Sequence, residues 1–458
     1  MTVTIEFVRS RQVPRLDRCT PQELLAYFQD AWILEEALFN SLIDSATFYA
    51  QPDALRNPLI FYLGHSAVFY INKLVRVGLI SERINPAFEA LFEVGVDPET
   101  PDDLNAAIAT VDWPDVAAVW HYRDRVREAI EQLIQTVDLS LPIHADHPLW
   151  ALLMGIEHQR IHVETSSMLL RQLPLDRLQR PAGWQDSPSL GPAPANPMVT
   201  IPGGTVTLGK SEGDRTYGWD SEYGQRIVEV EPFLMGKYPV TNGEYLEFVA
   251  AGGYDCADYW SAEAWEWKQA NGVQHPKFWR STSTGYVYRL TFAERALPLD
   301  WPVEVNYYEA IAFCCWKGPT MRLMTEAEWN RARQMVEGDR ADQDSSDRLD
   351  LNWNLNWNWV SPCPVGWLQS DDQAHLPADL RGNVWEWIGE PFYPLPGFQP
   401  HPLYEDQSAP FFDDRHQLML GGSWATNGAM ALPSYRNWFR PYFYQHVGFR
   451  IAQSIARH

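Results

Sequence analysis

The chain has 458 residues, of which 45% are hydrophobic, so it can bury a large core divided between two or three domains. Its 36 lysines and arginines stand against 59 aspartates and glutamates, which gives a net charge of −23. This acidic balance disfavours phosphate backbones and anionic membranes, because no basic stretch is present to bind them. We therefore expect neither a nucleic acid partner nor a membrane partner.

The cysteines and the first residues bear on the cellular compartment. The five cysteines form no CxxC pair and no even framework, so neither a zinc ribbon nor a secreted disulfide scaffold is predicted. Residues 1–13 lack the apolar core of a signal peptide, and the longest apolar run, 58–74, is too short and too polar to span a bilayer. We expect a soluble protein in a reducing cytoplasm.

The first third of the chain has helical periodicity. A capping box with proline at the first helical position, Thr20-Pro21-Gln22-Glu23, opens a predicted helix that runs to about Ile43. A second helix is predicted over 58–77, a third after Asp112 as N-cap, and a fourth from about Pro148. Four helices of this length predict a helical bundle over residues 1–173.

The character of the sequence changes after residue 173. Five prolines within residues 181–197 cannot continue a helix, so we place a linker at 174–197. Beyond it, β-like runs at 198–208 and 226–233 alternate with turns and with helical segments at 242–251 and 325–335. Residues 198–458 are therefore predicted to form a loop-rich α+β domain. Within it, the alternating Asn/Trp tract 352–359 fits a strand about as well as a flexible loop.

Three histidines are the strongest chemical signal. His158 and His162 lie one turn apart on the fourth predicted helix, so both imidazoles can reach one metal ion. His65, in an apolar stretch of the second helix, is the third candidate ligand. An isolated buried histidine is usually a hydrogen-bonded core residue, but three placed this way favour a metal site.

Three imidazoles form a neutral donor set with open coordination positions, which suits Fe(II), Zn or Cu better than Mg or Ca. Glu164 is a candidate for orienting a histidine ligand through a hydrogen bond. Its interpretation as a capping or solvated helix charge is slightly better.

Several motifs resemble known families. His65 with the His158/His162 helix resembles the metal-binding DinB-like bundle. Residues 198–458 resemble the formylglycine-generating-enzyme (sulfatase-modifying factor) domain, a C-type-lectin-like fold. The motifs that carry the second resemblance are Ile201-Pro202-Gly203-Gly204, 238–245, 322–329, Gly382-Asn383-Val384-Trp385-Glu386-Trp387, Gly421-Gly422-Ser423-Trp424 and Gly448-Phe449-Arg450. The pairing of the two domains resembles the nonheme-iron sulfoxide synthases of the ovothiol and ergothioneine routes.

Formylglycine generation itself is not expected. The reactive cysteine pair of that family lies in the segment that reads 434–441 here, which contains no cysteine. Cys314 and Cys315 lie elsewhere and are expected to pack a helix as small hydrophobes. The motif tryptophans Trp385, Trp387 and Trp424 are expected to be core and turn scaffolding.

The two branches of synthases are separated by a few positions. Stretches such as 57–65, 82–86, 119–124 and 155–174 resemble the ovothiol branch, whereas Arg436-Asn437-Trp438 resembles the ergothioneine branch. Ergothioneine-type enzymes carry a substrate-holding glutamine where this chain has Ile161. Their γ-glutamylcysteine pocket is also poorly matched, because 92–97 is acidic and Phe439 follows Trp438. The resemblance thus implies cysteine as the thiol donor.

The implied reaction joins cysteine to the imidazole of histidine, giving 5-histidylcysteine sulfoxide, with Fe(II) on His65, His158 and His162 and with O2 as co-substrate. A tyrosine between Trp387 and Gly421 would supply a proton; Tyr404 is the first candidate and Tyr393 the second, although either fits equally well as a packing aromatic. Candidate substrate-binding residues are Ile161, Asn437, Trp438 and Arg440, the last of which also fits a surface charge. The site is expected between the two domains.

Three alternatives stay open. An ergothioneine-type synthase would use histidine betaine with cysteine or γ-glutamylcysteine. A DinB-type zinc thiol transferase would activate a thiol without consuming O2. A lectin-like binding protein would use the bundle only as a structural metal site. No Gly-rich cofactor fingerprint is present, so any methylation in the pathway is assigned to a separate methyltransferase.

Overall fold

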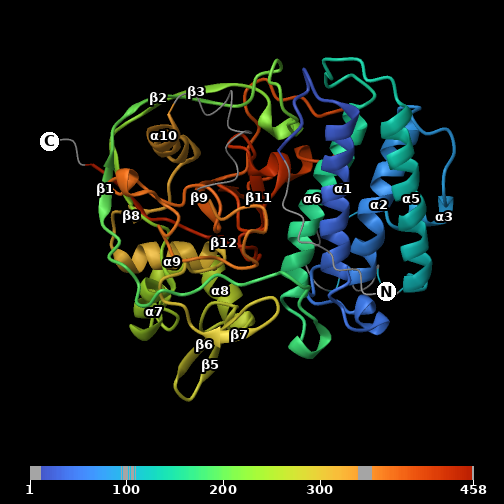
Figure 1. Cartoon of the computed structure of the whole chain (residues 1–458). Helices are drawn as coiled ribbons and strands as arrows, with labels where there is room; N and C mark the ends of the chain where they lie inside the picture. The colour runs from blue at the N-terminus through green and yellow to red at the C-terminus, as the bar shows by residue number, and fades with distance from the viewer. Residues whose placement is uncertain are drawn as a thin grey trace. The chain divides into compact units, whose positions relative to one another are not determined.

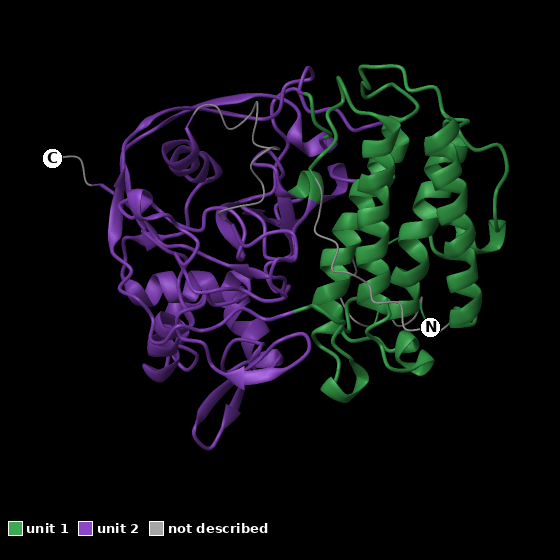
Figure 2. Ribbon diagram, viewed as in Figure 1, with its two compact units in different colours: residues 1–184, 215–217, 428–430 green, residues 185–214, 218–427, 431–458 purple. Residues whose placement is uncertain are grey.

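The computed structural model describes residues 12–93, 95, 102, 104, 108, 110–338 and 353–455. Contacts divide the chain into two compact units (Figure 2). Unit 1 comprises residues 1–184, 215–217 and 428–430, and unit 2 comprises residues 185–214, 218–427 and 431–458. The predicted fold class, a helical bundle followed by an α+β domain, is confirmed. In the described part of the chain, no helix combines the length and apolar character needed to cross a membrane.

Unit 1 is built from long helices that lie side by side (Figure 1). They are α1 (Pro21–Phe39), α2 (Leu59–Arg76), α5 (Val116–Thr136) and α6 (Trp150–Leu170), with the short α3 (Pro86–Leu91) after α2. Helix α6 packs against α1 and α2, and α5 packs against both α1 and α2. The arrangement is the predicted four-helix bundle.

The helix boundaries show which sequence signals are dependable. The predicted capping box is present, with Glu23 N donating to Thr20 Oγ1 (3.2 Å) and Thr20 N donating to Glu23 Oε2 (2.8 Å). The prediction of Asp112 as the N-cap of the third helix was wrong, because α5 begins after Asp115. Pro114 disfavours helical backbone at the residue before it, so the helix starts only beyond the proline.

Unit 2 contains two four-stranded sheets. The first has the order β1 (Met198–Ile201), β4 (Phe233–Gly236), β13 (Ala452–Ser454) and β8 (Met321–Arg322), all antiparallel. The second has the order β11 (Asn437–Phe439), β10 (Gln417–Leu420), β9 (Trp385–Pro391) and β12 (Val447–Gly448), with β12 parallel to β9. In the second sheet Leu418 lies opposite Trp438.

Smaller sheets and helices complete the unit. Strands β2 (Gly204–Leu208) and β3 (Arg226–Val230) form a ribbon, and β5 (Trp279–Thr282), β6 (Gly285–Arg289) and β7 (Glu294–Ala296) form a three-stranded sheet. The helices are α7 (Asn242–Ala250), α8 (Ala262–Ala270), α9 (Tyr307–Lys317) and α10 (Glu326–Glu337).

Three sequence interpretations are refined by this structure. Each predicted β run is two strands, because Pro202-Gly203 and Pro232 interrupt the hydrogen-bonding ladder. The tract 352–359 is a loop where it is described, since Asn356 and Trp357 have φ values of 58° and 57°, which no strand allows; Asn352 lies outside the described residues. Helix α8 was not predicted, and α9 was expected only as the helix that Cys314 and Cys315 would pack.

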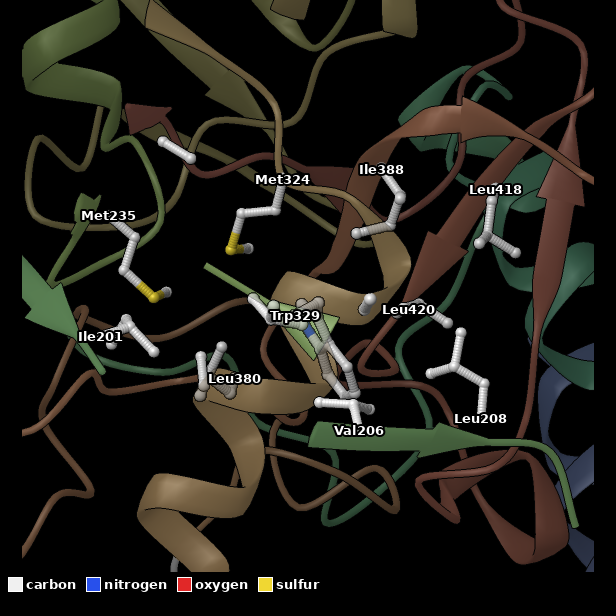
Figure 3. Packing of buried hydrophobic residues seen from close by; sticks show 14 of the residues in the cluster. Ile201, Val206, Leu208, Met235, Met324, Trp329, Leu380, Ile388, Leu418 and Leu420 are labelled. Carbon is white, nitrogen blue, oxygen red and sulfur yellow. The ribbon is translucent and has the colours of Figure 1, made fainter. Parts of the chain in front are cut away.

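The core of unit 2 gathers around Trp329 of α10. In Figure 3 its indole lies among Val206 of β2, Met324 and Leu380, and all of these side chains are buried. Ile201 of β1 in the first sheet and Ile388 of β9 in the second sheet belong to the same cluster. The core therefore joins strands of both four-stranded sheets to one helix.

Two of the recognised motifs meet in a buried ion pair. Arg450 donates from Nη2 to Glu386 Oε1 at 2.7 Å and also donates to the carbonyl oxygens of Gly236 and Ala378. Trp385, Trp387 and Trp424 are buried, and Trp387 Nε1 donates to the Val305 carbonyl. These motif residues hold loops together, which is the scaffolding role expected of the tryptophans.

Candidate metal centre

The three candidate ligands lie on two helices of the bundle that pack against each other. His65 belongs to α2, and His158 and His162 belong to α6. Gly155 permits these helices to approach, because a Cβ at that position would lie 2.4 Å from the ring of Tyr70 on α2. The close packing of α2 on α6 brings the histidines of the two helices together.

The histidines form one compact group. Their ligand atoms all lie within 4.8 Å of one another, and the Nε2 atoms of His158 and His162 are 3.1 Å apart. Ring centroids are 4.9 Å apart for His65 and His158 and 4.5 Å apart for His65 and His162. The sequence-based expectation that residues from two separate helices converge is matched by this geometry.

A backbone carbonyl fixes the orientation of His65. Its Nδ1 lies 2.6 Å from the carbonyl oxygen of Phe92, and because a carbonyl only accepts, Nδ1 carries the proton. The Nε2 atom is thereby left with its lone pair. Metal-ligating histidines usually donate their other ring N–H to a carbonyl or a carboxylate in this way, which fixes the orientation of the ring.

Burial keeps all three imidazoles neutral. Desolvation lowers the pKa of His65 to about 4, although the hydrogen bond to Phe92 opposes this shift. Burial, followed by the neighbouring imidazoles, lowers the pKa of His158 well below its usual value, and burial does the same for His162. Their lone pairs are therefore available at neutral pH.

Aromatic rings and cations surround the group. Phe69 stacks on His158 with centroids 3.6 Å apart, and Phe61 stacks on His65 at 4.8 Å. Lys73 lowers the pKa of His65 and His158, and Arg56 lowers that of His162, so both cations act on the site. Their positive potential favours an anionic group beside the imidazoles.

The donor set fits a transition metal ion. Two imidazole nitrogens that share an ion at about 2.1 Å lie roughly 3.0–3.4 Å apart, which matches the 3.1 Å between His158 and His162. The Nδ1 atom of His162 is buried and has no hydrogen-bond partner among the described residues. Three neutral nitrogen donors leave further coordination positions open, as in catalytic rather than structural sites.

A buried polar network lies directly behind the ligands. Glu35 Oε2 of α1 accepts hydrogen bonds from Ser66 (2.9 Å), Gln159 (2.7 Å) and Arg123 (2.7 Å). Ser66 follows His65 and Gln159 follows His158, and Tyr70 donates to Gln159 at 2.8 Å. One carboxylate oxygen thus connects all four long helices beside the two that carry the histidines. The sequence analysis missed this network, because its members are separated by up to 124 residues.

Tyr404, the first candidate for the proton donor, lies in a loop of unit 2. It is half-buried, and its ring lies 6.4 Å from that of Trp219 in an edge-to-face arrangement. Burial raises its pKa, and the nearby carboxylates of Asp406 and Asp220 raise it further. The phenol therefore holds its proton at neutral pH.

Tyr393, the second candidate, is committed to an ion network. Its hydroxyl donates to Glu326 and accepts from Arg226 at 2.7 Å. Glu326 in turn pairs with the buried Arg436, whose Nε donates to it at 2.7 Å. These contacts give Tyr393 a structural role in holding this ion network together.

The other predicted substrate contacts have varied surroundings. Trp438 stacks in parallel on Phe392, with centroids 4.2 Å apart, and Asn437 accepts the Trp438 amide at 3.0 Å. Arg440 is buried, so the interpretation as a surface charge was wrong. Ile161 is half-buried on α6.

The structure also describes Glu164 and part of the stretch 92–97, both of which the sequence analysis discussed. Glu164 is buried on α6, so a solvated helix charge does not describe it. In the acidic stretch 92–97, Val94, Val96 and Asp97 lie outside the described residues.

The adjacent cysteines Cys314 and Cys315 offer no alternative nucleophile. Cys314 of α9 is buried as expected, whereas its neighbour Cys315 is exposed, so only the first packs as a core hydrophobe. Burial raises the pKa of both thiols, and it raises that of Cys19 to about 11. Neither member of the pair is a thiolate at neutral pH.

Comparison with known proteins places this geometry in a family. The DinB superfamily matches residues 5–166, and the sulfatase-modifying factor enzyme 1-like domain matches residues 186–455. The chain is 32% identical to the hercynine oxygenase of Mycobacterium tuberculosis over 90% of this chain and 94% of that protein. The chain belongs to the hercynine oxygenase family. It is an oxidoreductase of the sulfoxide synthase type.

Other relatives agree with this membership. The hercynine oxygenase of Mycolicibacterium smegmatis is 30% identical over 87% of this chain and 91% of that protein. Ergothioneine biosynthesis protein 1 of Neurospora crassa is 25% identical over 93% of this chain, which covers 57% of that longer protein. The similarity to hercynine oxygenases therefore spans both units.

The first prediction concerns the metal site. His162→Ala removes one of three donors, so we expect its affinity for Co(II), used as a spectroscopic probe, to fall at least about 100-fold. His121→Ala, at an exposed position on α5, is the matched control and should bind Co(II) like the wild type. Unchanged Co(II) affinity in a folded His162→Ala protein would refute the site.

The second prediction concerns the buried network. Arg123→Ala removes the ionic partner of the buried Glu35, and we expect it to destabilise the helical unit by about 3–5 kcal/mol. The half-exposed Arg127 pairs with Glu36 and Glu131 on the same two helices, so Arg127→Ala should cost about 0–1 kcal/mol. Urea unfolding followed by helical circular dichroism measures both, and equal losses would contradict the role assigned to Glu35.

Proposed function

We propose that this protein is an O2-dependent nonheme iron sulfoxide synthase that forms a C–S bond between cysteine and the imidazole of hercynine, the trimethyl betaine of histidine. The observation that carries the proposal is the group of three neutral imidazoles, found in a chain of the hercynine oxygenase family. Iron is the preferred ion because the reaction class consumes O2, which zinc does not activate.

The overall reaction balances without any added reductant. One thiol, one imidazole C–H and one O2 give a sulfoxide and one water, so the four oxidising equivalents of O2 are all used. Fe(II) bound by His65, His158 and His162 would supply the redox chemistry and gather thiol, imidazole and O2 at its open positions. No separate redox cofactor is required.

The residues around the histidines suit an anionic thiol. Lys73 and Arg56 give the site a positive potential, which stabilises a thiolate or a carboxylate beside the ion. Phe61 and Phe69 pack on two of the ligands and exclude water from that side. Cysteine is favoured over γ-glutamylcysteine as donor, because the positions that hold the dipeptide in ergothioneine-type enzymes are not matched in this sequence.

On this proposal the C-terminal unit contributes the remaining groups. Tyr404 holds a proton on its hydroxyl and donates it as the sulfoxide forms. Asn437 and Trp438 hold the amino-acid portion of the imidazole substrate, and Arg440 pairs with its carboxylate.

Histidine is the second candidate acceptor, which would make the product 5-histidylcysteine sulfoxide of the ovothiol route. The observation in its favour is the set of sequence stretches that resemble ovothiol-type synthases, among them 57–65, which includes His65. The family relatives, by contrast, are named for hercynine and ergothioneine. A separate methyltransferase would be needed in either pathway.

The third prediction tests the proposed function. With Fe(II), cysteine and hercynine, we expect O2 uptake and a sulfoxide product in a one-to-one ratio, measured by an oxygen electrode and by mass spectrometry with NMR of the imidazole ring. Parallel reactions with histidine and with γ-glutamylcysteine identify the preferred acceptor and donor. Thiol conversion without O2 uptake would instead indicate a zinc thiol transferase, and ligand binding without turnover would indicate a binding protein.

The fourth prediction tests the choice of tyrosine. Tyr404→Phe removes the proton donor, so we expect the ratio of cysteine sulfinic acid to sulfoxide to rise about tenfold or more, because oxidation of the thiol alone competes. Tyr393→Phe should leave this ratio unchanged and lower thermal stability, since it loses the hydrogen bond to Glu326. The opposite pattern would transfer the proton-donor role to Tyr393.

A further inference from the structure

Glu157, the residue directly before His158, has a carboxylate that is fully buried on α6. Its Oε1 accepts a hydrogen bond from the hydroxyl of Tyr27 on α1 at 2.5 Å. Its Oε2 accepts a hydrogen bond from the backbone amide of Ala429 at 2.9 Å. Both oxygens are therefore engaged, one by the bundle and one by a chain segment 272 residues away.

The segment that carries Ala429 belongs to unit 1. Residues 428–430 cluster with the helical bundle, whereas the flanking residues 218–427 and 431–458 belong to unit 2. In the sequence the segment lies between the motif Gly421-Gly422-Ser423-Trp424 and strand β11, which begins at Asn437. The chain thus leaves the bundle at 430 and reaches a proposed substrate contact only seven residues later.

Gly428 shows that this attachment has a demanding geometry. Its φ of +66° is a conformation that residues with a Cβ rarely adopt. A Cβ there would lie 2.4 Å from Cδ of Arg160 and 2.6 Å from the hydroxyl of Tyr27. Arg160 is itself held in place, since its Nη2 donates to the Tyr27 carbonyl at 3.0 Å. Only glycine therefore lets the segment reach Glu157.

We propose that Glu157 is a positioning residue that fastens the 428–430 segment to the ligand-bearing helix and thereby restrains the chain that continues to Asn437 and Trp438. This inference rests on the proposed function. The hydrogen bond from Ala429 to the Glu157 carboxylate is buried, and the position of Glu157 beside His158 ties the segment to the helix that holds two ligands. Loss of the attachment should weaken binding of the imidazole substrate while leaving the metal ligands intact.

Gly428→Ala is the main test, because it displaces the segment without altering Glu157 or any histidine. Gly272→Ala is its matched control: Gly272 follows α8 with a φ of +62°, and a Cβ there would meet nothing within 4 Å. Both substitutions carry the same backbone strain, and only the first meets Arg160 and Tyr27. The purified full-length proteins are compared for Co(II) affinity and for anaerobic binding of cysteine and of hercynine to the Co(II) form.

We expect Gly428→Ala to bind hercynine about tenfold more weakly, within the usual range of coupling between two sites, with Co(II) and cysteine affinities within about twofold of the wild type. Gly272→Ala should behave as the wild type. Unchanged hercynine affinity in Gly428→Ala would overturn the inference, and so would a parallel loss of Co(II) affinity. A wild-type Co(II) protein that binds neither cysteine nor hercynine would overturn the proposed function and this inference together.

A second pair of variants separates positioning from general stability. Glu157→Gln can still accept from Ala429 through its oxygen and donate to the Tyr27 oxygen through its nitrogen, so hercynine binding should be retained. Glu157→Leu cannot do either, and its hercynine affinity should fall as in Gly428→Ala. In both Gly428→Ala and Glu157→Leu, hydrogen exchange of the peptide that spans 428–430 should accelerate relative to the wild type. Equal hercynine affinities or equal exchange rates for the Gln and Leu variants would contradict the role of Glu157.

Discussion

The removal of charged and polar groups from water inside a four-helix bundle is the constraint on which the rest of unit 1 depends. Buried carboxylates and guanidinium groups are tolerated only when partners with good geometry replace the lost water. In this bundle Glu35 meets that condition by accepting three hydrogen bonds on one oxygen. Since the donors come from α2, α5 and α6, the rotation of each helix about its axis is restricted, and the faces that carry the histidines are restricted with it.

The same requirement explains why the histidines converge instead of pairing elsewhere. A neutral imidazole in an apolar setting still needs a partner for each nitrogen. His65 finds one in the Phe92 carbonyl and directs its other nitrogen towards α6. Aromatic stacking by Phe61 and Phe69 fills the space around the rings without offering competing hydrogen-bond partners. The bundle thus holds three imidazole lone pairs close together in an apolar site, where a metal ion can accept them.

The sequence predicted the local features of this site better than the long-range ones. The i, i+4 spacing of His158 and His162 and the capping box at Thr20 depend only on neighbouring residues, and both were read from the sequence. The start of α5 was misplaced because Pro114 overrides the N-cap signal of Asp112. The pairs Glu35–Arg123 and Glu157–Ala429 join distant parts of the chain, and no periodicity within one helix indicates such partners.

The neutrality of the donor set also bears on substrate choice. Three imidazoles leave the full charge of a divalent ion uncompensated, and in a buried site this charge must be balanced by the groups that arrive. A thiolate would supply such a charge directly, whereas a neutral thiol would not, so on the proposed function the ion and the two nearby cations would favour deprotonation of the sulfur. The protein as a whole has a net charge of −23, which disfavours the approach of an anion in general. On the proposed function, affinity for an anionic thiol would therefore come from this local centre, and the position of its positive charge would determine where the sulfur binds.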